Sequence, residues 1–97
     1  MTRRLSQIND FLRDELGQFF LKEVEWPLGV FVTIRRVELS EDKKNAKIFL
    51  NVFPHEKINE IKPMLSPVLK MARFWFTHRL SWHQIPEMKL VIEEDNN

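Results

Sequence analysis

The sequence predicts an α+β fold in which helices pack on one face of a three-stranded sheet, in the order helix, strand, strand, helix, helix, strand. Two apolar runs rich in β-branched and aromatic residues flank a short polar break between residues 30 and 53, which is typical of an antiparallel hairpin. Segments with helical periodicity lie on both sides of this hairpin, and a third apolar run follows them. A domain with only three strands has too few layers to cover both faces of its sheet, so the helices are expected to pack on one face.

The first helix is predicted over residues 3–23. Its apolar residues recur at steps of three and four, as on one face of a helix, whereas Asn9 lies elsewhere on the wheel. The helix should end before Trp26-Pro27-Leu28-Gly29, because residues before proline avoid helical angles and glycine permits a turn. The predicted core residues of this helix are Leu5, Ile8, Leu12, Leu16, Phe19 and Phe20.

The hairpin is predicted to contain a β-bulge at or next to Arg35-Arg36. In the second strand Ala46, Ile48, Leu50 and Val52 fall on one face, opposite Lys47, Phe49, Asn51 and Phe53. In the first strand the apolar residues change parity between Ile34 and Val37, so one extra residue must be absorbed there.

The last part of the chain is predicted to hold two helices joined at a kink, and then a strand over residues 88–92. Pro63 disturbs a short helix over residues 56–65, and Ser66-Pro67 has the pattern of a new helix start with Ser66 as the N-cap. The second helix should run from Pro67 to about Trp82, with an apolar stripe made of Val68, Met71, Ala72, Trp75, Phe76 and Leu80. This order of elements is that of the type II KH-like fold.

The composition is that of one small globular domain, expected over residues 1–97 with 3–93 structured and 94–97 frayed. The sequence has no cysteine and no apolar run long enough for a membrane span, and its start lacks the apolar core of a signal peptide, so a cytoplasmic location is expected. Net charge is only +1, but Lys57 to Lys89 carries six basic residues against two acidic ones, which indicates a basic face. Glu93-Glu94-Asp95 is expected to be a solvated acidic tail.

The sequence offers no constellation for catalysis, cofactor binding or a metal site. His78 and His83 are five residues apart and would diverge on a helix, and no cysteine or paired acid adds to them or to His55. Ser66 and Ser81 lack a histidine–acid partner pattern, and two glycines do not make a phosphate-binding loop. No enzyme activity, cofactor or small-molecule substrate is therefore expected.

Aromatic residues suggest two further surfaces, each with a structural alternative. Phe31, Phe49 and Phe53, interleaved with Lys47, could form a sheet face on which bases stack, although aromatic residues in strands more often pack in the core. The second long helix carries more aromatic residues than one buried stripe can hold, so one or two of them should anchor a partner: Phe74, Trp75, Phe76 and Trp82.

Three motifs together resemble the ribosome-binding factor A family of bacterial small-subunit assembly factors. They are Pro27-Leu28-Gly29 before the first strand, Val37-Glu38-Leu39-Ser40-Glu41-Asp42 followed by Ala46-Lys47-Ile48, and Arg73 followed by Ile85-Pro86-Glu87-Met88. The resemblance runs from Arg4 to about Glu93. Two places depart from the family pattern: Val68-Leu69-Lys70 stands where the family has Ala-x-Gly, and His83-Gln84 where it often has arginine. The chain resembles a divergent, short member.

The resemblance implies a non-catalytic factor that binds 16S rRNA on the small ribosomal subunit late in maturation, as a monomer when off the ribosome. The alternative is a protein-interaction adaptor that has lost RNA binding. Arg3 and Arg4 are either phosphate contacts or a solvated arm, and Arg73 occupies the family's arginine position. The predicted nucleic-acid contacts are Arg3, Arg4, Lys47, Lys62, Lys70, Arg73 and Arg79.

Overall fold

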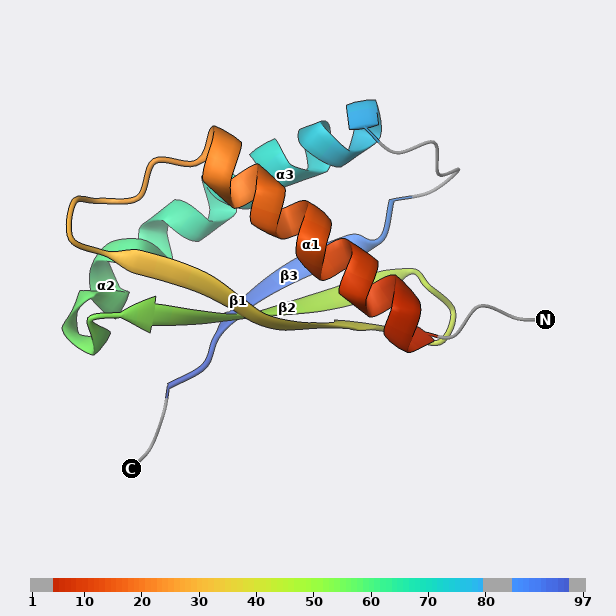
Figure 1. The fold of residues 1–97 in the computed structure, drawn as a ribbon, viewed down its shortest axis with the longest axis horizontal. Coiled ribbons are helices and arrows are strands. Elements are labelled where there is room, and N and C mark those ends of the chain that lie inside the picture. Colours follow the sequence, from red (N-terminus) through yellow and green to blue (C-terminus); the bar gives the residue numbers. More distant parts are fainter. Residues whose placement is uncertain (1–4, 80–84, 95–97) are drawn as a thin grey trace.

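The computed structural model describes residues 5–79 and 85–94 of the chain (Figure 1). The predicted order of elements is confirmed. The long elements are α1 (Leu5–Glu23), β1 (Phe31–Leu39), β2 (Asn45–Phe53), α3 (Leu65–Arg79) and β3 (Glu87–Ile92). Between β2 and α3 lie three short helical turns, η1 (His55–Lys57), α2 (Ile58–Ile61) and η2 (Lys62–Met64).

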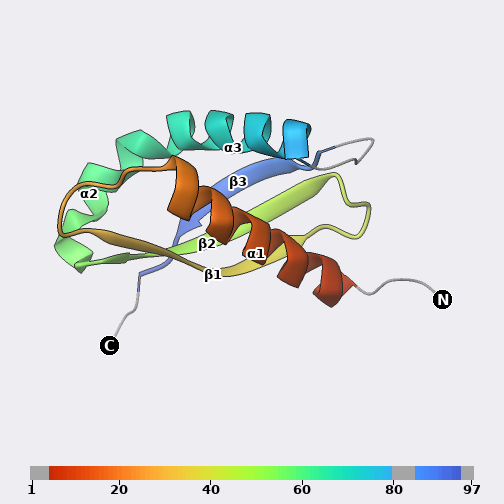
Figure 2. The ribbon, with the colours of Figure 1, turned by 45° about the horizontal axis from the view of Figure 1, so that its top comes forward.

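The sheet is mixed, and β2 is its central strand. β1 pairs with β2 in antiparallel fashion, and β3 pairs with the other edge of β2 in parallel. The parallel pairing follows from the crossover through α2 and α3, which returns the chain to the end of the sheet where β2 began (Figure 2). The sequence pattern left this strand order open.

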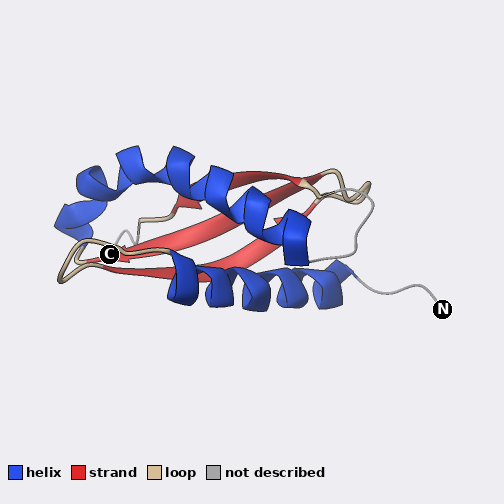
Figure 3. Ribbon diagram, turned by 90° about the horizontal axis from the view of Figure 1, so that it is seen from above, coloured by secondary structure: helices blue, strands red, loops and turns tan. Residues whose placement is uncertain are grey.

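Both long helices cover the same face of the sheet, as Figure 3 shows from the helix side. The side chains of β2 that point to the helices are all buried: Ala46, Ile48, Leu50 and Val52. The alternate residues of β2 point the other way and are exposed or half-buried, so the predicted assignment of faces is confirmed. We call the side away from the helices the open face; it carries Phe31, Thr33, Arg36, Glu38, Lys47, Phe49, Asn51, Phe53, Lys89 and Val91.

The core lies between this sheet and the two helices. Of the residues predicted for α1, four are buried and Ile8 packs beside them, while the side chain of Leu5 lies outside the described part. In α3 the stripe is narrower than predicted: Met71 is 43% exposed, and Trp75 is only half-buried, with its ring 5.8 Å from the ring of Phe19. Both line the groove between α3 and α1, so the sheet does not cover them. The buried residues of α3 are Val68, Ala72 and Phe76.

The predicted bulge in β1 is confirmed. Ile34 pairs with Leu50, but the next pair is Arg36 with Phe49, so Arg35 is the extra residue. The insertion returns Val37 to the buried face, opposite Ile48. It also turns Arg36 onto the open face.

The junction between α2 and α3 differs from the prediction. α3 begins at Leu65, so Ser66 lies inside its first turn and the N-cap assignment is wrong. Pro63 occupies one of the first positions of the turn η2, where a missing N–H costs nothing. Because Leu65 has helical angles, the chain passes from η2 into α3 without the extended residue that an N-cap needs.

The hairpin loop is held by two side chains of the second motif. Ser40 Oγ donates a hydrogen bond to Asp42 Oδ1 at 2.6 Å, and the Lys44 N–H donates to the same oxygen at 3.0 Å. The first of these bonds is the main reason why the pKa of Asp42 lies below its usual range. The Asn45 N–H donates to Ser40 Oγ at 3.1 Å, which closes the loop against β2. Ser40 and Asp42 of the second motif therefore have a structural role in closing the hairpin loop.

The residue between these contacts gives a stability prediction. Lys43 has φ of 62°, a left-handed conformation that side chains with a Cβ adopt at a cost. We expect Lys43→Gly to raise the free energy of unfolding by about 1 kcal/mol in urea melts. Lys44→Gly is the matched control, since Lys44 lacks positive φ and glycine there should destabilise. Equal changes in the two variants would contradict the conformational argument.

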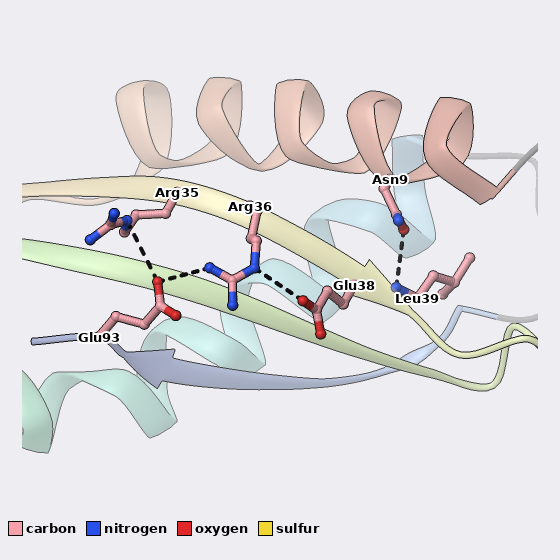
Figure 4. Close-up of polar contacts among 6 residues, drawn as sticks. All are labelled: Asn9, Arg35, Arg36, Glu38, Leu39 and Glu93. Atoms are coloured by element: carbon pink, nitrogen blue, oxygen red, sulfur yellow. Dashed lines mark hydrogen bonds and ion pairs between the residues drawn. The ribbon is translucent and has the colours of Figure 1, made fainter.

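Asn9, which lies off the predicted apolar stripe of α1, links this helix to the edge of the sheet. Its Oδ1 accepts a hydrogen bond from the Leu39 N–H at 3.0 Å (Figure 4). That N–H lies at the end of β1, an edge strand, where β2 does not satisfy the outward-pointing groups.

The contribution of this hydrogen-bond acceptor to stability should be measurable. We expect Asn9→Ala to lower the free energy of unfolding by about 1–2 kcal/mol, because it leaves a partly buried N–H without a partner. Asn9→Asp keeps an oxygen in the same place and should lose less. A urea melt in which Asp and Ala cost the same would show that the hydrogen bond is not the source of the loss.

Candidate nucleic-acid interface

The outer surface of α3 and the turn before it carries three exposed cations, Lys62, Lys70 and Arg73, which we call the basic face. At about 100° per residue, Arg73 lies about 60° from Lys70 around the helix. Neither Lys62 nor Lys70 makes an ion pair with any residue that the structure describes. Two of these charges are therefore available to an anionic partner.

Arg73, which carries the third motif, has a weak partner. Its Nη1 lies 3.7 Å from Glu87 Oε1 at the start of β3, and both side chains are exposed. The two charged members of the motif thus meet in space, which gives the motif a structural explanation. An exposed pair at this distance contributes little to stability and is screened by salt, so Arg73 can still exchange Glu87 for a phosphate.

Arg79 lies apart from the basic face. It is nine residues after Lys70, about 180° around α3, and its Nε donates to Glu15 Oε1 of α1 at 2.6 Å. Its guanidinium also stands over the ring of Trp75, 4.9 Å from the ring centre. The chain therefore uses Arg79 to join α3 to α1, and a phosphate would have to compete with both contacts.

The other predicted contacts are Lys47, Arg3 and Arg4. Lys47 is exposed on the open face, on the opposite side of the sheet from α3. Arg3 and Arg4 lie outside the described residues. So do Trp82 and His83-Gln84, where the sequence departs from the family pattern. Of the five predicted residues that the structure describes, three are exposed on α3 or on the turn before it: Lys62, Lys70 and Arg73.

A cluster on the open face was missed by sequence reasoning. Arg36 Nη1 donates to Glu93 Oε1 at 3.0 Å, and Arg35 Nε lies 3.5 Å from the same oxygen (Figure 4). The side chain of Glu93 is only 27% exposed, so its assignment to a solvated tail is wrong. Its carboxylate instead pairs with the two arginines at the bulge. The parity change located these arginines, but no signal in the sequence pointed to a partner beyond β3.

Arg36 is held from two further sides. Its Nε donates to Glu38 Oε2 at 3.0 Å, and this hydrogen bond is the main reason why the pKa of Arg36 lies above its already high usual value. The guanidinium stands 3.9 Å from the ring centre of Phe49, in cation–π geometry. Phe49 is therefore covered by Arg36 and is not a free stacking surface.

The described residues contain no group of three or more histidine, cysteine, aspartate or glutamate side chains that could hold a metal ion. His78 Nδ1 lies 2.9 Å from the carbonyl oxygen of Phe74 on its own helix. An apolar void of about 10 Å³ lies in the core beside Phe76 and Ile85, which is no more than a single water could occupy. Within residues 5–79 and 85–94, no helix has the length and apolar character that crossing a membrane requires.

Comparison with known proteins identifies the family. The family model for ribosome-binding factor A matches residues 4–97. The chain is 28% identical to ribosome-binding factor A of Chlamydia pneumoniae over 98 residues, covering 95% of this chain and 79% of that protein. It is 34% identical to the Chlamydia abortus protein of the same name over 95 residues, with the same coverage of 95% and 79%. A solution structure from Thermotoga maritima, titled as a candidate ribosome binding factor A, matches with a TM-score of 0.59 and 26% identity over 96% of this chain and 90% of that one. The chain belongs to the ribosome-binding factor A family.

Proposed function

We propose that this chain binds the small ribosomal subunit during late maturation and contacts 16S rRNA through the basic face. The observation that carries the proposal is the placement of Lys62, Lys70 and Arg73 on one exposed surface, in a chain of this family. The chain is not an enzyme, because its family consists of non-catalytic ribosome maturation factors. We further propose that it acts in the cytoplasm and is a monomer off the ribosome.

The proposed mechanism is positioning by charge. Lysine and arginine side chains on a helix contact phosphates and fix orientation without reading sequence. Because α3 is anchored to the sheet by Val68, Ala72 and Phe76, the basic face is a rigid surface that can hold rRNA strands in a fixed arrangement. Such a factor favours the immature subunit only to the extent that it binds that form more tightly than the mature one.

Co-sedimentation with purified subunits tests this proposal. We expect the chain to sediment with immature small subunits and less with mature ones, and Arg73→Ala to weaken binding while the melting temperature stays unchanged. Arg13→Ala is the matched control, because Arg13 is an exposed arginine of α1 paired with Asp10 and Asp14. If Arg73→Ala binds less only because it unfolds, or if Arg13→Ala loses as much, the basic face is not the site.

One observation favours the alternative of a protein adaptor. A groove of about 580 Å³ runs between α1 and α3, and Phe74 beside it is 68% exposed. The groove is lined by Phe19, Glu23, Lys70, Met71, Phe74, Trp75, His78 and Arg79. An adaptor would lose its partner in Phe74→Ala but need not sediment with ribosomal subunits at all, so the same experiment separates the two functions.

A further inference from the structure

We propose that the open face of the sheet is a second RNA site, which binds unpaired nucleotides by stacking their bases on Phe31 and Phe53. This surface lies on the opposite side of the sheet from the basic face, as the position of both helices above the sheet makes clear (Figure 1). The proposal does not rest on the contact proposed for α3, and either can fail without the other.

The two phenylalanines form an exposed aromatic pair. Phe31 of β1 and Phe53 of β2 are direct partners in the antiparallel ladder, so their side chains stand next to each other on the open face. Each is 64% exposed. The alternative interpretation of these aromatic residues was that they pack in the core. The exposure of Phe31 and Phe53 excludes core packing for this pair.

The next residue pairs along the sheet carry the other side chains that binding of single-stranded RNA requires. The next pair is Thr33 with Asn51, whose hydroxyl and amide can hydrogen-bond to base edges. Beyond the covered ring of Phe49, Lys47 of β2 lies beside Lys89 of β3. From Phe53 to Lys47 the strand spans about 20 Å at about 3.3 Å per residue, enough for several nucleotides.

The charges of the open face favour a polyanion. Arg36 is balanced by Glu38 and Glu93. Lys47 and Lys89 make no ion pair with any residue in the described ranges, although Glu38 is the cross-strand neighbour of Lys47. Arg35 shares Glu93 with Arg36, and Glu87 at the start of β3 is paired with Arg73. Four basic side chains therefore stand against Glu38 and Glu93, and the net charge here is positive: Arg35, Arg36, Lys47 and Lys89. The exposed pair of rings at one end of the open face and the lysines at its other end match stacked bases followed by phosphates. A basic or purely apolar peptide would leave the lysines without a partner.

The geometry also selects the form of the RNA. Bases in a duplex are stacked on one another and cannot lie on a protein ring, whereas unpaired bases can. The open face should therefore prefer single strands, while the basic face, which contacts phosphates alone, should accept either form.

Titration followed by NMR tests the site, with a short oligoadenosine single strand and an RNA duplex of equal length as probes. We expect weak binding of the single strand, with a dissociation constant of about 10⁻⁴ M, and resonance changes centred on Phe31, Thr33, Asn51 and Phe53. The double variant Phe31→Leu/Phe53→Leu stays apolar but cannot stack, and should weaken single-strand binding by about tenfold or more. The control Lys70→Ala/Arg73→Ala should leave these resonance changes in place.

Each other outcome overturns the proposal. Changes confined to α3 would mean that the basic face is the site for single strands too. Full affinity in the double leucine variant would exclude stacking. Equal changes with the duplex or with polyglutamate would show a surface for any polyanion, including an acidic protein. If the isolated chain self-associates in analytical ultracentrifugation and the double variant does not, the open face belongs to a second copy of the chain.

Discussion

Replacing Phe76 with alanine should lower the free energy of unfolding by about 3–5 kcal/mol, close to the whole stability of a small domain. Phe76 is 1% exposed and lies in the core between α3, α1 and the central strand. Truncation removes its burial and leaves a cavity that two helices, each fixed to the sheet, cannot close. Urea denaturation of the variant and the parent chain measures the loss.

The same helix supplies the control. Phe74 is two residues earlier and exposed, so Phe74→Ala removes the same atoms from water-facing surface and should cost less than about 1 kcal/mol. Equal losses in the two variants would mean that α3 is rotated about its axis relative to this packing.

The second large effect concerns binding. Changing Lys62, Lys70 and Arg73 together to alanine should weaken binding to immature small subunits by about 100-fold, if each exposed charge-assisted contact contributes about 1 kcal/mol. The slope of log affinity against log salt should also decrease in magnitude by about 2, since three phosphate contacts at about 0.7 each are lost. Affinity measured at several salt concentrations gives both values.

A charge-preserving variant makes this result specific. Lys62→Arg, Lys70→Arg and Arg73→Lys together keep every charge on the basic face and should retain most of the affinity and the full salt slope. If the alanine variant binds like the parent chain at all salt concentrations, the basic face does not contact rRNA.

Periodicity predicted most of the fold. Alternation in β2 assigned Ala46 to the core and Lys47 to the open face, because the side-chain period of a strand is fixed. The change of parity after Ile34 required one extra residue, and the structure contains it at Arg35. Both inferences depend only on local geometry, which is why the sequence was sufficient for them.

What the sequence did not provide depends on contacts between distant segments. The sequence placed Asn9 off the apolar stripe of α1 but gave no partner for it, because a helical wheel cannot include a strand that ends thirty residues later. Met71 was placed in the core because a stripe on α3 does not show how far the sheet extends beneath it. The order of the strands in the sheet could not be predicted, because all three strands are apolar and the pattern does not show which of them is central.

The candidate site was predictable in composition but not in arrangement. The sequence identified a locally basic segment, yet whether each cation is free depends on partners elsewhere: Arg79 meets Glu15, and Arg36 meets Glu93, both far away along the chain. Lys70 is exposed at the edge of the groove between α1 and α3, and it makes no ion pair with any residue that the structure describes. Only the folded chain separates the cations that hold the structure together from those that can bind a phosphate.

If α3 presents its basic face to 16S rRNA, photo-cross-linking of the bound complex should place rRNA on this helix. The complex of the chain with immature small subunits containing 4-thiouridine in their rRNA would be irradiated, and the cross-linked residues identified by mass spectrometry. We expect cross-links to 16S rRNA between Lys62 and Thr77, on the exposed side of η2 and α3. A complex that forms but gives rRNA cross-links only on the outer side of α1, or only to ribosomal proteins, would contradict it.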